Sequence, residues 1–262
     1  MPTYPYGTRV GPAVGGSLPG LPRKKEAGFT MPLIVVIDSG SGEFKIPSGY
    51  SKVRITAVGA GGTSVQNNWG GSGAGLAITD FMPASGSITY SVATVGDQNA
   101  TTCSYQGVSL LANNGKTGTS TGAPGGTATG GLRNFTGGSG GVKVGNFIGG
   151  GGEAACTYRD GASANSNISQ PVDGAGNRGY YSTTSDGFGA DGGCGSNCLF
   201  KQYPLDYWMI FGTPGGIGAV NNTSGTGIAG AGGFPGGGAG AGAGSVSNNI
   251  PGAGCIRIEL WP

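Results

Sequence analysis

The 262-residue sequence contains no histidine. A Ser-His-Asp triad, a zinc site with imidazole ligands and acid–base catalysis by an imidazole are therefore excluded. Charged residues are also scarce, with 12 Asp and Glu against 14 Lys and Arg. A net charge of +2 produces no strong field that would recruit nucleic acid or an anionic membrane. We expect neither partner, and carboxylate chemistry is thinly supplied.

Long apolar segments are missing as well. No run of about 18 apolar residues occurs, so the sequence predicts no transmembrane helix and no membrane insertion. Residues 1–6 do not join a basic stretch to an apolar one, so they do not predict a secretory signal.

Cysteine is limited to five residues, an odd number that leaves at least one without an intrachain partner. Without histidine, these thiols do not predict a four-ligand zinc site, and we expect no metal and no cofactor. Cys194 and Cys198 are separated by three residues. They either close a small disulfide loop or remain buried thiols, and the sequence leaves both possibilities open.

Glycine, in contrast, is abundant: 61 glycines and 15 prolines make up about 29% of the chain, a share typical of low-complexity sequence. However, 36% of the residues are hydrophobic and only 10% are charged. A disordered chain is usually charged and poor in aromatic residues, whereas this one has 9 Phe, 10 Tyr and 3 Trp. We therefore expect one folded domain with an additional arm.

Short β-branched or alternating segments predict an all-β fold with almost no helix. We expect a single β-sandwich-like body, and the motif Asn113-Asn114-Gly115 predicts a hairpin turn. Glycine and β-branched residues interrupt every candidate helix. The expected strands are residues 33–37, 51–58, 76–81, 87–95, 108–111 and 255–261.

Two glycine-rich stretches have their own period. Glycine recurs every third residue from 227 to 236, and a weaker register runs from Gly122 to Gly140. Three residues per turn is the period of a polyproline-II helix, and glycine allows such helices to approach closely. Packed polyglycine-II-like segments are therefore one interpretation, and a flexible linker is the other. Residues 239–244 repeat with period two and fit a strand or a loop.

Residues 1–32 form a proline-rich arm, separate from a domain at 33–262. The arm has four cationic residues against Glu26, and proline keeps it extended. Such an arm docks on another protein, unless it is a solvated tail. The candidate anchoring residues are Tyr4, Tyr6, Arg9, Arg23, Lys24 and Lys25.

Residues 153–214 form an insert that is poor in glycine and rich in aromatic side chains. Tyr, Trp and Arg are the residues that dominate binding surfaces, so the insert predicts a recognition site. A small satellite core is the alternative. The candidates within it are Tyr158, Arg159, Tyr180, Tyr181, Tyr203, Tyr207 and Trp208, and two more, Trp69 and Tyr105, lie in turns outside it.

One resemblance covers roughly residues 40–150 and 215–262. The segment GEFKIPSGYSKVRITAVGAGG at 42–62 resembles the opening of the glycine-rich domain of bacteriophage tail-fibre and receptor-binding proteins. Residues 75–96 and 108–115 also fit, and GAGCIRIELW at 252–261 is similar to the run of that family into a last strand. The alternation of glycine-rich and variable segments is also similar, in architecture only, to the distal adhesins of T-even-like phages.

The resemblance implies a virion protein that attaches a phage to its host and catalyses nothing. Its arm would bind other tail proteins, and its body would bind a host surface protein or glycan. It would act as a trimer or in several copies, made in the host cytoplasm and released by lysis. The alternative is a purely structural tail or capsid decoration protein. Five Asp residues between 160 and 206 show no spacing that pairs two carboxylates for glycan cleavage.

Overall fold

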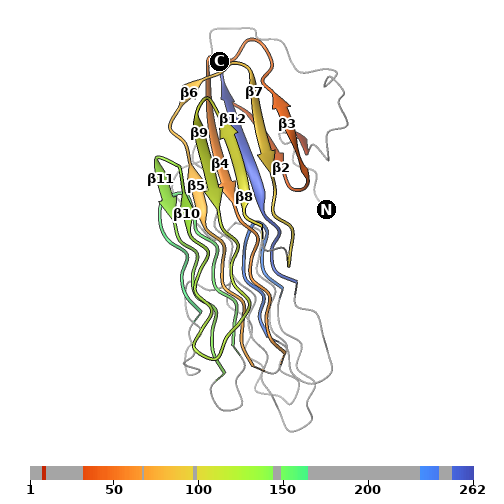
Figure 1. Ribbon diagram of the computed structural model, residues 1–262, viewed down its shortest axis with the longest axis vertical. Helices are drawn as coiled ribbons and strands as arrows, with labels where there is room; N and C mark the ends of the chain where they lie inside the picture. Colours follow the sequence, from red (N-terminus) through yellow and green to blue (C-terminus); the bar gives the residue numbers. More distant parts are fainter. Residues whose placement is uncertain are drawn as a thin grey trace.

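The computed structural model describes residues 8–9, 32–66, 68–96, 99–143, 149–164, 231–241 and 250–262. These ranges contain strands, turns and extended segments and no helix, which confirms the all-β fold. The molecule is elongated: labelled strands occupy one half, and extended segments continue from them into the other (Figure 1).

A seven-stranded sheet contains both ends of the domain. Its order is β1 (Thr8–Arg9), β2 (Leu33–Ile37), β12 (Cys255–Trp261), β4 (Lys52–Val58), β5 (Leu76–Ile78) and β11 (Arg133–Phe135), and β6 (Met82–Pro83) also pairs with β4. Strand β12, whose alternating sequence predicts a strand, lies antiparallel between β2 and β4. The C-terminal strand is therefore central and closes the sheet.

The short β1 belongs to the predicted arm. It pairs in parallel with β2 of the same chain, so the arm is not wholly separate from the body. The candidate anchoring residues Tyr4, Tyr6, Arg23, Lys24 and Lys25 lie outside the described residues, and Arg9 is placed only by its backbone.

The second sheet has five antiparallel strands. Their order is β10 (Ala128–Thr129), β9 (Val108–Ala112), β8 (Thr101–Tyr105), β7 (Ser87–Ser91) and β3 (Ser41–Lys45). The tight turn between β8 and β9 is Gln106-Gly107, where φ is 45° and 81°. Positive φ at both central residues is the geometry of a hairpin turn whose twist matches the strands.

The predicted hairpin at Asn113-Asn114-Gly115 is wrong. Strand β9 continues past Ala112 into an extended segment, because the Asn114 side chain is held at both ends. Its Oδ1 accepts the N–H of Ala60 at 2.8 Å, and its Nδ2 donates to the carbonyl of Asn99 at 2.9 Å. Asn114 therefore connects two loops instead of turning the chain.

The two sheets pack face to face around an apolar core. Val53, Ile55, Ile256, Ile258 and Leu260 point from the seven-stranded sheet toward the other and are fully buried. Ile88, Tyr90, Cys103 and Leu110 meet them from the five-stranded sheet. Alternation along each strand thus produces the predicted sandwich.

On the opposite face of the seven-stranded sheet lies a buried charge cluster. Glu259 on β12 is 1% exposed and accepts hydrogen bonds from Arg54 on β4, with Nη2 at 2.7 Å and Nε at 3.1 Å. Arg257 Nη1 lies 3.2 Å from the other oxygen of Glu259. Burial lowers the pKa of Arg257 to about 10, although the neighbouring carboxylate favours its charged form.

Candidate functional site

The glycine-rich segments form a bundle that continues from the ends of the strands. Residues 59–63 leave β4, 70–75 lead into β5, 113–118 leave β9, and 123–127 lead into β10. Three more segments, 136–141, 149–155 and 236–241, run beside them. No strand is assigned within these segments, and Figure 1 shows them as parallel extended traces below the sheets.

Residues 70–75 form the centre of this bundle. Their N–H groups donate to three neighbouring segments in rotation, with N–O distances of 2.9 to 3.1 Å. A bonding direction that repeats every third residue is what a three-residue-per-turn helix produces. Residues 70 and 73 donate to segment 136–141, residues 71 and 74 to segment 236–241, and residues 72 and 75 to segment 113–118.

The carbonyl groups of the central segment bind three further neighbours. They accept N–H groups from segment 149–155 at residues 71 and 74, from 59–63 at residues 72 and 75, and from 123–127 at residue 73. Six segments thus surround one. Residues 70–75 thus pack as a polyglycine-II-like helix does, although the glycine period of three was recognised at 122–140 and 227–236.

The two stretches with a glycine period of three do not form continuous helices. Between Gly122 and Gly140 the chain forms β10 and β11, which pair with β9 and β5. In the run from 227 to 236 only 231–236 is described, and it ends in a turn where Gly236 has φ of 78°. Residues 239–241, predicted as strand or loop, belong to the bundle.

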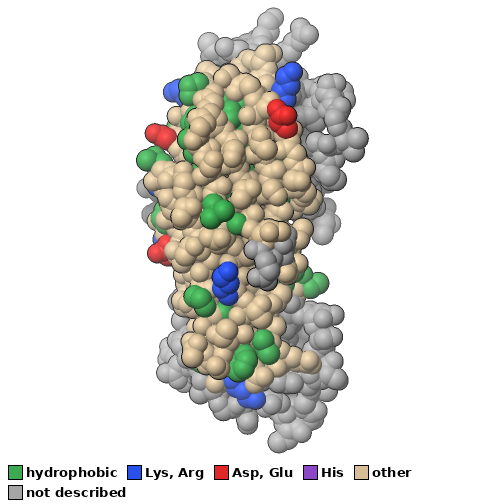
Figure 2. Space-filling view, viewed as in Figure 1, with side chains coloured by type: hydrophobic (Ala, Val, Ile, Leu, Met, Phe, Trp, Pro, Cys, Tyr) green, Lys and Arg blue, Asp and Glu red, His purple; other side chains and the backbone are tan. Residues whose placement is uncertain are grey.

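Close packing explains the glycines at the centre. A Cβ added at Gly73 would lie 1.8 Å from the carbonyl oxygen of Glu153, and one added at Gly70 would lie 2.0 Å from that of Gly150. Both clashes are with backbone, which no side-chain rotation relieves. Figure 2 shows one face of the molecule, on which few charged side chains are visible among the described residues.

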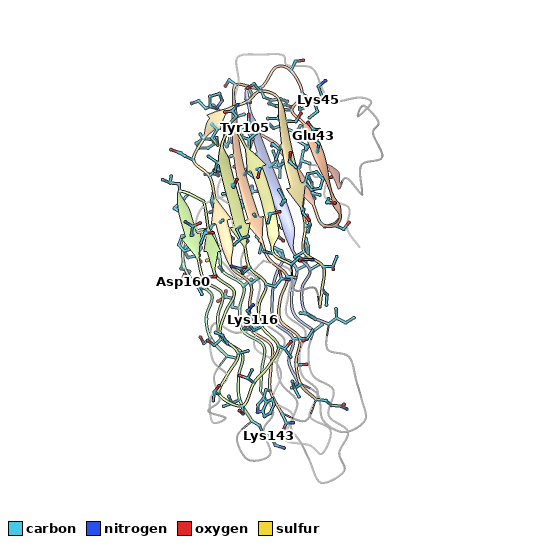
Figure 3. The ribbon with its side chains drawn as sticks, in the orientation of Figure 1. Glu43, Lys45, Tyr105, Lys116, Lys143 and Asp160 are labelled. Carbon is cyan, nitrogen blue, oxygen red and sulfur yellow. The ribbon has the colours of Figure 1, made fainter. Side chains whose placement is uncertain are left out.

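The end of the bundle away from the sheets gathers turns from different parts of the chain. Residues 64–69 connect 59–63 to 70–75, and residues 119–122 connect 113–118 to 123–127. Lys143 lies at the same end (Figure 3). Of the residues at this end, sequence reasoning selected Trp69 as a candidate and did not select residues 119–121 or Lys143. Their position between two glycine-rich segments was the available signal.

Trp69 is half-buried in the first of these turns. Its carbonyl accepts the N–H of Val65 at 2.8 Å, and its own N–H donates to the carbonyl of Val65 at 3.1 Å. Two hydrogen bonds therefore fix the backbone that carries the indole. The turn therefore has a defined backbone conformation at the far end of the bundle.

The predicted pair Tyr158 and Arg159 lies elsewhere, in a turn after segment 149–155 and near the sheets. Arg159 binds both oxygens of Glu153 at 2.9 Å. Its guanidinium carbon lies 5.9 Å from the centre of the Tyr158 ring, which is 51% exposed. The charge of Arg159 is therefore paired with Glu153 within this region, whereas the Tyr158 ring remains accessible to solvent. Asp160 is labelled beside this region in Figure 3.

The prediction that Tyr105 contacts a partner is wrong, because the ring is only 3% exposed. Its hydroxyl accepts the N–H of Ser85 at 2.9 Å, and its one proton lies within reach of the carbonyl groups of Pro83 and Ser85. A buried tyrosine usually has a hydrogen-bond partner for its hydroxyl, and the Tyr105 ring belongs to the core of the sandwich.

We expect Tyr105→Phe to lower the free energy of unfolding by about 1–2 kcal/mol, because the N–H of Ser85 loses its acceptor. Urea unfolding measures the loss. A variant with parental stability would contradict the structural role assigned to this hydroxyl.

The other predicted contact residues, Tyr180, Tyr181, Tyr203, Tyr207 and Trp208, lie outside the described residues, as do Cys194 and Cys198. In the part that is described, no three His, Cys, Asp or Glu side chains group to hold a metal ion. Burial raises the pKa of Cys103 to about 12 and also raises that of Cys255, which keeps both thiols protonated.

No helix among the described residues is long and apolar enough to cross a membrane. No family model matches the chain, and no curated protein matches it.

Proposed function

We propose that this protein is a receptor-binding adhesin of a bacteriophage tail fibre. It attaches the virion to a host surface protein or glycan and performs no catalysis. Other tail proteins hold it through the arm at 1–32. Several copies on one virion, as a trimer or on separate fibres, strengthen the contact by multivalency.

One observation carries the proposal: the bundle brings turns from separate parts of the chain to one end, where residues 119–121 are exposed and Trp69 is half-buried. The segments behind them are joined by backbone hydrogen bonds in three directions, so the turns sit on a rigid support. Binding residues are commonly found on loops that a rigid scaffold positions. The resemblance of residues 42–62 to phage receptor-binding domains supports the same function.

A competition assay tests the proposal. Purified full-length protein, mixed with host cells before phage are added, should block adsorption in a dose-dependent manner. A heat-unfolded sample of the same protein serves as the control. A structural decoration protein would leave adsorption unchanged at saturating concentration, and that result would overturn the proposal.

Trp69→Ala should weaken adsorption of the purified protein to host cells at least tenfold. An aromatic anchor often contributes about 2 kcal/mol or more, and 1.4 kcal/mol is a factor of ten. The matched control is Phe81→Ala, which removes a ring that is 42% exposed but lies beside β6 in the sheet half. Equal affinity of the Trp69 variant and its parent would place recognition elsewhere, with the aromatic insert at 153–214 as the next candidate.

A further inference from the structure

A polar hollow of about 80 Å³ lies on the side of the bundle, away from its far end. The backbone of 61–63 forms one wall and residues 114–117 form another. Gly96, in the loop between β7 and β8, closes it from the sheet side. Asn114 ties this loop to the bundle through its bond to Asn99, so the walls keep a fixed separation.

The lining of the hollow carries one positive charge and no negative charge. Lys116 is the one charged residue in its lining, and none of the lining residues is acidic. Within the described ranges no ion pair is formed by its ammonium group. Figure 3 places Lys116 about midway along the molecule. The hollow therefore favours an anion over a cation or a neutral solute.

Two threonines add hydroxyl groups to the same hollow. Thr63 Oγ1 and Thr117 Oγ1 lie 2.9 Å apart, so one hydroxyl donates to the other. Because each hydroxyl carries one proton, the accepting hydroxyl still has its own proton to donate to a ligand. A hydroxyl donor in the same lining as a lysine suits an oxygen of a phosphate or carboxylate.

The backbone that carries these side chains is held in place. Lys116 donates its N–H to Ser72 Oγ at 2.6 Å and accepts the N–H of Ser72 at 3.1 Å. Gly118 donates to the carbonyl of Thr63 at 2.9 Å, which fixes the opposite wall. Only the lysine side chain needs to be ordered when a ligand enters, which limits the entropy lost on binding.

We propose that this hollow binds the oxyanion group of a ligand, a phosphate or a carboxylate. In the setting of host attachment, such a group is carried by an anionic surface glycan, and this part rests on the proposed function. The site is separate from the turns at the far end of the bundle. It would provide a second contact on the flank of the same molecule.

Inorganic phosphate, methyl phosphate and acetate, titrated at low ionic strength into the full-length protein labelled with ¹⁵N, test the site. We expect saturable shifts of the amides of Thr63 and Thr117. Lys116→Met should weaken binding at least tenfold, and Thr117→Val several-fold. The matched control, Lys143→Met, removes a lysine at the far end and should bind as the parent does. Comparing methyl phosphate with acetate identifies the preferred group.

Each outcome is decisive. Absence of saturation with all three anions, or equal losses in the two lysine variants, would overturn the site. If Lys116→Met abolishes anion binding but leaves host adsorption at the parental level, the anion site is supported. An anionic surface glycan is then excluded as its ligand. If the protein binds phosphate but does not compete with phage for host cells, the anion site is supported and the proposed function is overturned.

Discussion

Gly73→Ala is expected to prevent the bundle from forming. An extra methylene in a packed core usually costs about 1–3 kcal/mol, because neighbouring side chains shift. Here the new Cβ would meet the carbonyl oxygen of Glu153 at 1.8 Å, and Gly73 itself belongs to the central segment. We expect aggregation, or a melting temperature at least about 10 °C below that of the parent, measured by circular dichroism.

Gly42→Ala is the matched control for this change. Gly42 lies on the exposed strand β3, and its added Cβ would meet the outer end of the Tyr90 side chain, with the hydroxyl oxygen at 3.2 Å and ring carbons at 3.4 and 3.8 Å. The end of a side chain can move, so the melting temperature should change by no more than about 2 °C. Equal melting of both variants and the parent would show that residues 70–75 are not tightly surrounded.

Glu259→Gln should produce the second large loss of stability. The carboxylate is shared by Arg54 and Arg257, and neither Glu259 nor Arg257 is more than 2% exposed. Removing one partner of a buried ion pair costs about 3–5 kcal/mol, because a charge stays behind in a poorly solvated site. The midpoint of thermal unfolding should fall by roughly 6–20 °C.

Glu43→Gln provides the comparison. This carboxylate is exposed on β3, and Figure 3 shows it near Lys45 at the edge of the sheet. Its neutralisation should change the free energy of unfolding by no more than about 0.5 kcal/mol. If Glu259→Gln were as mild as this control, the buried cluster would not contribute to the stability of β12.

Strands β2, β4, β5, β7, β9 and β12 could be predicted from the sequence because their signal is local, whereas β3 and β8 were not predicted. Val53, Ile55, Ile256 and Ile258 alternate with outward residues, and the period of two is visible without a structure. The ends of the strands were less predictable. Residues 79–81 and 92–95 were expected to belong to strands but lie beyond the ends of β5 and β7. Their sequences contain no signal that would end a strand.

The arrangement of the bundle could not be predicted in the same way. A glycine period of three indicates the type of helix but not which segment lies beside which, because the contacts are made by backbone groups that every residue has. The positions of Gly122 and Gly233 suggested long helices, and the turns that interrupt them became evident only from the chain path. Recognition residues are harder still, as Tyr105 shows: composition cannot separate a buried tyrosine from an exposed one.

The central position of residues 70–75 also bears on how stability varies with temperature. The heat-capacity increase on unfolding comes from apolar surface, whereas newly hydrated peptide groups reduce it. In the bundle the buried material is mostly glycine backbone, and the apolar residues are concentrated in the sheets. A chain of this size should therefore show a smaller heat-capacity change per residue than a typical globular protein. Its curve of free energy against temperature would be flatter, so stability would fall off slowly toward cold as well as toward heat.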